Sequence, residues 1–158
     1  MISLTELKRR LENIVQVGSI SETKMKDGKA LARVILDEDE EERRVTRFLP
    51  VVSLANSYGK VWFPLRVDEQ VLVISPFGNA NSGFIIRSIF NRNCKEPDGS
   101  NGHTAIITFE DGTKISYDSK AKHLSFDCVG DITLKAGGKI KIQAAGEVDI
   151  DGSRIDLN

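Results

Sequence analysis

The amino-acid sequence predicts an all-β protein that begins with one short helix. Three observations support this fold class. Apolar residues at helical spacing are confined to residues 1–15. Alternating apolar and polar residues recur across residues 16–91, which is strand spacing. A turn-rich linker, 92–102, then leads into a C-terminal region, 103–158, that contains an eight-residue repeat.

The N-terminal segment has an apolar stripe typical of an amphipathic helix. Ser3 followed by Glu6 is a capping-box pattern, and Gly18 is a candidate stop. The stripe consists of Leu4, Leu7, Leu11, Ile14 and Val15. It must pack either on the following domain or on a partner subunit.

Residues 16–91 contain five predicted strands. Val17–Thr23 and Ala30–Leu36 flank Asp27-Gly28, which is a hairpin signal. The acidic run 37–42 is expected to be a solvated loop. Further strands are predicted at Arg44–Pro50, Val67–Ser75 and Gly83–Phe90. Five strands in so short a segment suggest a small closed Greek-key barrel, as in the OB-fold.

Barrels of this kind often bind nucleic acid through basic grooves with stacking aromatic residues. The candidates here are Arg43, Arg44, Arg47, Tyr58, Lys60 and Trp62. The neighbouring acidic run and a formal net charge of −1 argue against this function. We therefore expect no nucleic-acid partner.

The C-terminal repeat places a glycine before two apolar residues, in the pattern Gly-x-apolar-x-apolar. The repeat glycines are Gly130, Gly138 and Gly146, expected to turn the chain with positive φ. The apolar positions of the five copies are Leu124, Phe126, Ile132, Leu134, Ile140, Ile142, Val148, Ile150, Ile155 and Leu157. We expect these side chains to form a buried core.

Two arrangements fit this repeat. Each copy could form one side of a prism whose other sides come from neighbouring chains. Alternatively, the copies could form an antiparallel meander within one chain. The periodicity favours the prism, because an isolated short sheet would leave open edges and a one-sided apolar face.

Other function classes have little support in the sequence. No catalytic motif is present, and only two histidines occur, His103 and His123, twenty residues apart. We expect no enzyme activity, no cofactor and no metal site. Cys94 and Cys128 are expected to be reduced thiols. The start of the chain has no signal-peptide pattern and no apolar run long enough to span a membrane.

Two motifs resemble the phage baseplate assembly protein V family, the central spikes of contractile tails. Val61-Trp-Phe-Pro-Leu-Arg-Val-Asp-Glu-Gln-Val71 is similar to the family's Trp-x-x-Pro-x-x-Gly-Glu-Gln-Val, through Trp62, Pro64, Glu69, Gln70 and Val71. Trp62 lies one place nearer the proline, and Asp68 replaces the usual glycine, which makes a tight turn there less expected. The segment from Phe109 to Tyr117 resembles Phe-x-Asp-Gly-x-x-Ile-x-Tyr, through Phe109, Asp111, Gly112, Ile115 and Tyr117.

The resemblance covers nearly the whole chain and implies a function. It implies a homotrimer in which OB domains dock on a baseplate hub protein while three C-terminal segments intertwine into a triple-stranded β-helix, as in the related VgrG spikes of type VI secretion. Such a needle would puncture the host outer membrane. It would be made in the bacterial cytoplasm and placed at the distal end of a phage or tailocin tail tube. A separate PAAR-like tip protein is expected on Ile155 and Leu157.

The alternative function is an OB-type binding module for oligosaccharide or nucleic acid, with a β-rich tail. Trp62 separates the two hypotheses. A spike predicts Trp62 packed at the barrel wall, whereas a binding module predicts Trp62 in an open groove.

Overall fold

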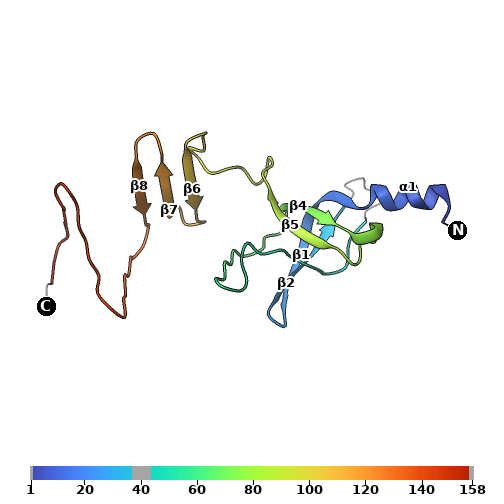
Figure 1. Ribbon diagram of the computed structural model, residues 1–158, viewed down its shortest axis with the longest axis horizontal. Helices are drawn as coiled ribbons and strands as arrows, with labels where there is room; N and C mark the ends of the chain where they lie inside the picture. The colour runs from blue at the N-terminus through green and yellow to red at the C-terminus, as the bar shows by residue number, and fades with distance from the viewer. Residues whose placement is uncertain (1, 37–43, 157–158) are drawn as a thin grey trace. The chain divides into compact units, whose positions relative to one another are not determined.

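The computed structural model describes residues 2–36 and 44–156. These residues form two units that divide between Asp98 and Gly99 (Figure 1). The first unit contains α1 (Leu4–Glu12), β1 (Val15–Lys26), β2 (Lys29–Ile35), β3 (Leu49–Pro50), β4 (Gln70–Ile74), the 3₁₀ turn η1 (Pro76–Gly78) and β5 (Phe84–Ile89). The second contains β6 (Thr104–Thr108), β7 (Lys114–Asp118) and β8 (His123–Asp127). The described residues are thus mostly β with one short α-helix, as predicted.

Helix α1 begins at the predicted cap and ends earlier than predicted. The Ser3 hydroxyl accepts a hydrogen bond from the Glu6 backbone amide at 3.1 Å. Side-chain hydrogen bonds from Arg9 and then Arg10 lower the pKa of Glu6 to about 2. Asn13 caps the C-terminus. The predicted stop, Gly18, lies instead inside β1, where a Cβ would overlap the Ile35 carbonyl oxygen.

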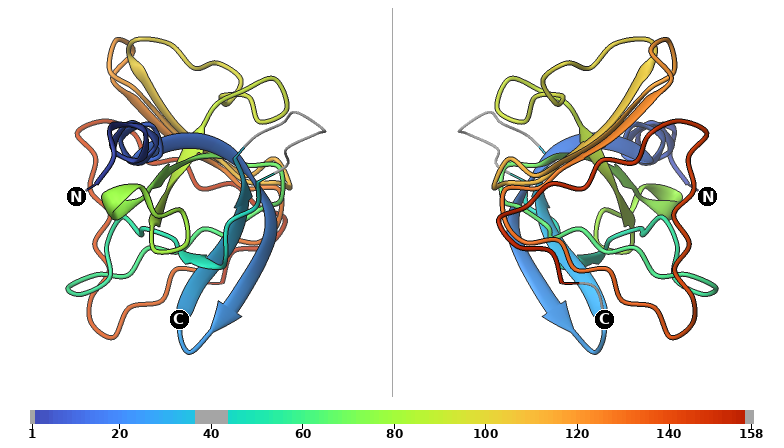
Figure 2. Two further views of the ribbon diagram at one scale, coloured as in Figure 1. Left: turned by 90° about the vertical axis from the view of Figure 1, so that its right-hand side faces the viewer. Right: turned by 90° about the vertical axis from the view of Figure 1, so that its left-hand side faces the viewer.

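The hairpin between β1 and β2 forms where Asp27-Gly28 predicts it. Both turn residues have positive φ, 53° for Asp27 and 70° for Gly28, which matches the right-handed twist of the flanking strands. A bulge between Ile20 and Glu22 interrupts the ladder. The bulge accompanies a strong curvature of β1, visible in both views of Figure 2.

The predicted strand Arg44–Pro50 is mostly wrong. Only Leu49–Pro50 forms a strand, with one isolated bridge between Val45 and Ile35. The reason lies at Thr46, whose side-chain oxygen accepts the hydrogen bond of the Val34 amide at 3.0 Å. Because a side chain takes the place of a backbone carbonyl, the regular ladder stops there.

The strands of the first unit close into a ring. The sheet order is β3-β2-β1-β4-β5, with antiparallel pairs throughout. Its two ends then meet, because Val51 and Ile85 form a parallel bridge and the Val52 amide donates to the Ile85 carbonyl at 2.9 Å.

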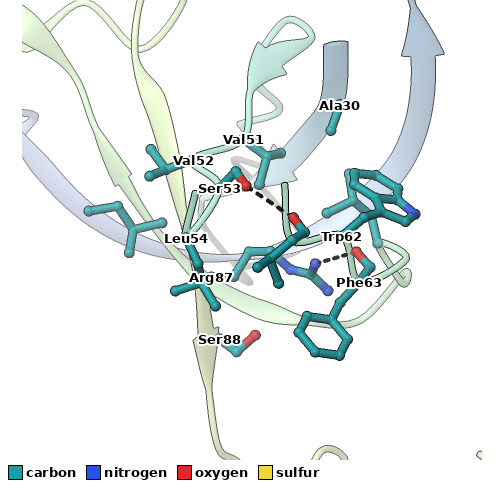
Figure 3. A pocket seen from close by; sticks show the side chains of 12 residues that line it. Ala30, Val51, Val52, Ser53, Leu54, Trp62, Phe63, Arg87 and Ser88 are labelled. Atoms are coloured by element: carbon teal, nitrogen blue, oxygen red, sulfur yellow. Dashed lines mark hydrogen bonds between the residues drawn. The ribbon is translucent and has the colours of Figure 1, made fainter. Parts of the chain in front are cut away.

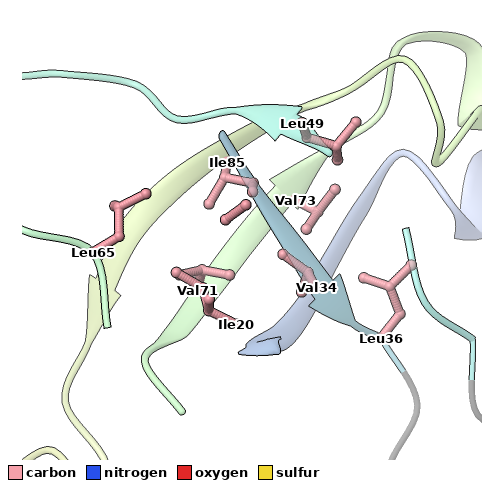
Figure 4. Close-up of a cluster of buried hydrophobic side chains, with 9 residues drawn as sticks. Ile20, Val34, Leu36, Leu49, Leu65, Val71, Val73 and Ile85 are labelled. Carbon is pink, nitrogen blue, oxygen red and sulfur yellow. The ribbon is translucent and has the colours of Figure 1, made fainter. Parts of the chain in front are cut away.

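The ring encloses an aliphatic core (Figure 4). The buried apolar residues are Ile20, Ala32, Val34, Leu36, Leu49, Leu65, Val71, Val73 and Ile85. The alternation on β2 and β4 places every second side chain inside. Each large aliphatic residue contributes about 1.5–3 kcal/mol relative to exposure.

The second unit is a three-stranded antiparallel sheet followed by extended chain. Its strand order is β6-β7-β8. The predicted turn at Asp111-Gly112 is present: Gly112 has φ 91°, and Asp111 accepts from the Thr113 amide at 2.9 Å. That hydrogen bond, followed by one from the Thr113 hydroxyl, lowers the pKa of Asp111.

Candidate functional site

The most unusual feature is the extended segment 128–156, which we call the repeat segment. Within the part of the chain that the structure describes, it forms no strand paired with another segment. The meander interpretation required antiparallel ladders between successive copies, and this structure contains none of them among the described residues. The backbone donors and acceptors of the repeat segment therefore lack ladder partners among the residues that the structure describes.

The chain bends once in each copy of the repeat, at residues 129–130, 137–138 and 145–146. The bends fall at Gly130, Gly138 and Gly146, as predicted, but none of these glycines has positive φ. That part of the prediction is wrong, because redirecting an extended chain needs no left-handed residue. A Cβ at any of the three would meet no atom within 4 Å.

The predicted core positions of the repeat segment are exposed in the single chain. Their exposed fractions lie between 49% for Val148 and 79% for Leu134. The exposed set is Ile132, Leu134, Ile140, Ile142, Val148, Ile150 and Ile155. Leu157, the second residue of the expected tip-protein surface, lies outside the described residues. In the described part of the single chain, the apolar stripe formed by these residues is therefore exposed to solvent.

The first two predicted core positions, Leu124 and Phe126, lie in a different setting. Both are on β8, where Leu124 pairs with Tyr117 and Phe126 with Ile115. The second motif thus shares one sheet with the first copy of the repeat. Phe109 lies at the β6–β7 turn, where its amide donates to Thr113 at 2.8 Å.

The N-terminal part of the first motif lines a pocket of about 410 Å³ beside β5 (Figure 3). Val52, Leu54, Trp62 and Phe63 line it together with Arg87. Trp62 is 53% exposed and lies in a loop. The expectation that it packs at the barrel wall is therefore wrong for the single chain, because no strand carries it there.

Arg87, which lines this pocket, forms an ion pair with Glu69. Arg87 donates to Glu69 from Nε at 2.6 Å and from Nη2 at 2.7 Å. The same guanidinium donates to the carbonyl oxygens of Phe63 at 2.7 Å and Pro64 at 2.9 Å. Arg87 thus ties the motif loop to β5, and the motif's proline and glutamate meet at one side chain.

The Glu69 carboxylate is held in its ionised form. Burial opposes ionisation, but hydrogen bonds from Arg87 and Ser88 outweigh it and lower the pKa of Glu69. Gln70 and Val71 follow in β4, and the Val71 side chain is in the core. The sequence analysis missed Arg87, although an arginine inside the apolar run of the last barrel strand is a signal for a buried partner.

Asp68, at the position of the family's glycine, adopts φ 68°. A tight turn therefore forms there without glycine. The turn is anchored by the Asp68 amide, which donates to the Ile20 carbonyl at 2.8 Å.

The candidate nucleic-acid residues do not converge. Trp62 lines the pocket, but Arg44, Arg47, Tyr58 and Lys60 are not among its lining residues. Arg44 instead lines a second hollow with Arg9 and Arg10. Arg43 and the acidic run fall outside the described residues.

The apolar stripe of α1 is not covered by the barrel. Leu4, Leu7 and Leu11 are 83%, 47% and 60% exposed. The helix contacts η1 through the Arg10 backbone, which lies against Gly78. A stripe for a partner therefore remains available on the outer face of the helix.

Two further features are absent from the described residues. These residues contain no group of three or more His, Cys, Asp or Glu side chains that could hold a metal ion. Nor do they contain a helix of the length and apolar character that crossing a membrane requires.

No protein-family model matches the chain. The chain is similar to the spike protein of Escherichia phage P2, with 23% identity over 140 residues. The aligned region covers 89% of this chain and 63% of that protein, so the chain spans under two thirds of its relative's length. The comparison supports a distant relation to a phage spike protein that extends over both units.

Proposed function

We propose that this chain is a structural spike of a phage-like contractile injection machine. In this proposal three copies associate, and their repeat segments intertwine into a needle. The observation that carries it is the repeat segment, which presents exposed apolar side chains at regular intervals and forms no ladder with another segment among the described residues. The distant similarity to the phage P2 spike protein supports the same role.

The physical argument concerns how the repeat segment becomes satisfied. A strand with free backbone groups gains most from pairing with other strands. Each octad spans at most about 26 Å when extended, too short to complete a wide coil alone. Three chains that each supply one side would pair every edge and bury the apolar stripe on a common axis.

The first unit fits the proposed role as an OB-type barrel. The order β3-β2-β1-β4-β5, closed by the parallel Val51–Ile85 bridge, supports this assignment. Its partners in the proposal are two further copies and the proteins of a baseplate. The needle would act mechanically, without catalysis, on the outer membrane of a host.

The test is the solution mass of the intact chain, measured by light scattering at micromolar concentration. The spike proposal predicts about three times the chain mass of 17.5 kDa. A monomer at all concentrations would refute the intertwined needle. If the mass is that of a trimer, electron microscopy should show a thin rod at one end of each particle.

A binding module is the second candidate, and one observation favours it. Trp62 is half-exposed at an apolar pocket, which is how a ring that stacks on a sugar is presented. Because Arg87 is fully engaged with Glu69 and two carbonyls, the described residues that line the pocket offer no free cation to a phosphate. Titration with neutral oligosaccharides should therefore change Trp62 fluorescence if this candidate is correct, and leave it unchanged if it is not.

A further inference from the structure

The β6–β8 sheet has one polar and one apolar face. In-register pairing aligns Ala105, Tyr117 and Leu124 in one row, and Ile107, Ile115 and Phe126 in another. Because rows alternate between faces, these two rows share a face, and all six residues are apolar. We call this surface the collar face.

The opposite face carries mostly polar side chains. Ser116 and Ser125 hydrogen-bond across it at 2.8 Å. Its single apolar residue, Ile106, lies close to Gly99, so the linker approaches that side. The polar face therefore needs no further partner.

The collar face, in contrast, is left uncovered. Ile107 and Tyr117 are 46% and 47% exposed, and Leu124 and Phe126 are 57% and 62% exposed. No charged side chain interrupts the two rows, so a charged partner surface has nothing to pair with. An apolar partner is required.

The collar face is continuous with the repeat segment. Leu124 and Phe126 precede Ile132 and Leu134 by eight residues, which is the period of the repeat. β8 is therefore both a strand of the folded sheet and the first copy of the apolar stripe. Whatever covers the stripe also lies over the collar face.

We propose that the collar faces of three copies of this chain pack together before the repeat segments intertwine, and that this contact sets their register. The inference rests on the trimer of the proposed function and deepens it. The collar is ordered within each chain, whereas the repeat segment acquires partners only from other chains. Hairpins form within microseconds, while subunit association depends on concentration.

Register needs such a device because the repeat is nearly uniform. A slip of one octad would place Ile132 beside Ile140 and would still match apolar with apolar. The collar has no such degeneracy, since Phe126 and Tyr117 have no aromatic counterparts in the later copies. Once three collars meet, pairing of the repeat segments is intramolecular and benefits from a high effective concentration.

Refolding kinetics of the full chain test the proposal. The protein is unfolded in guanidinium and diluted at several concentrations, and trimer formation is followed by light scattering. Phe126→Ser should slow trimer formation at least tenfold. Asp127→Ser, on the polar face of the same strand, should assemble at the wild-type rate. Ile150→Ser, deep in the repeat segment, should also assemble at nearly the wild-type rate but dissociate at lower denaturant.

Equal slowing by Phe126→Ser and Ile150→Ser, or no slowing by Phe126→Ser, would overturn the inference while leaving the trimer intact. A wild-type monomer would instead overturn the proposed function as well. Trp62 fluorescence reports whether the barrel has folded in each variant. If Phe126→Ser yields no folded protein, the milder Leu124→Ala replaces it with the same expected ranking.

Register is read from a pyrene label. Lys141→Cys, in a chain with Cys94 and Cys128 replaced by serine, carries one label per copy in the repeat segment. A slip of one octad moves the label of one copy to the next side of the proposed prism, which changes its distance to the labels of the other two copies. The parent trimer should give uniform excimer emission, and Phe126→Ser should reduce the excimer fraction. An unchanged fraction would contradict the register role.

Discussion

Removing the Arg87 guanidinium tests how the first unit holds its motif loop. In Arg87→Ala the Glu69 carboxylate, whose side chain is only 9% exposed beside Arg87, loses both ionic hydrogen bonds, at 2.6 and 2.7 Å. The Phe63 and Pro64 carbonyls lose their Arg87 donor as well. Breaking a buried pair in this way costs about 3–5 kcal/mol.

The assay is guanidinium unfolding followed by fluorescence. Trp62 is the only tryptophan of the chain, and it lies on the loop that Arg87 holds, so its emission reports the first unit and not the repeat segment. Small domains are stable by about 5–15 kcal/mol in total, so the midpoint should fall steeply. Arg87→Lys should recover part of the loss, because an ammonium can pair with Glu69 but cannot reach all four acceptors.

A double variant separates pairing from packing. Glu69→Gln with Arg87→Met removes both charges together, and it should be more stable than Arg87→Ala because no charge is left unpaired. A loss below about 1 kcal/mol in Arg87→Ala would refute the reasoning. It would mean that water reaches Glu69 and replaces the guanidinium.

Three further predictions concern pH, the needle and the motif turn. The pKa of Glu69 is lower in the folded chain than its ordinary 4.5. The stabilisation by ionised Glu69 is therefore complete above pH 4.5 and is lost as pH falls through the folded pKa. The free energy of unfolding of Glu69→Gln should accordingly fall less steeply with acid. Ile140→Asp should weaken the proposed trimer by several kcal/mol, because three carboxylates would meet in a dry layer. Lys141→Asp, on the outward face of the same copy, should leave the dissociation midpoint nearly unchanged. Equal effects would disprove that Ile140 faces inward and Lys141 outward. Asp68→Val should destabilise the first unit by about 1–2 kcal/mol, because a β-branched residue resists φ 68°. Asp68→Gly should be close to neutral, and thermal melting of the two variants measures the difference.

Local patterns predicted the hairpin turns and a strand of the first unit well. Asp27-Gly28 and Asp111-Gly112 form turns because their conformations are decided by neighbouring residues alone. Alternation likewise predicted a strand at Val67–Ser75, and β4 forms within that range with Val71 and Val73 in the core. These features need no knowledge of distant contacts.

Features that depend on distant partners were missed or misjudged. The strand expected at Arg44–Pro50 is cut short where the Thr46 hydroxyl accepts a hydrogen bond from the Val34 amide of β2, a contact that no local pattern reveals. Trp62 lies in a loop that Arg87 holds through the carbonyl of Phe63, 24 residues away in the sequence. The repeat glycines bend the chain without positive φ, because their conformation follows from the path of an extended strand and not from the residue type alone.

The unpaired repeat segment also has a consequence for newly made chains. Proteases bind their substrates as extended strands, and exposed extended chain is where cleavage concentrates. A copy that stays single should therefore be clipped between residues 128 and 156, while copies that have found partners are protected. Degradation would then act as quality control, removing solitary chains and leaving completed assemblies in the cell.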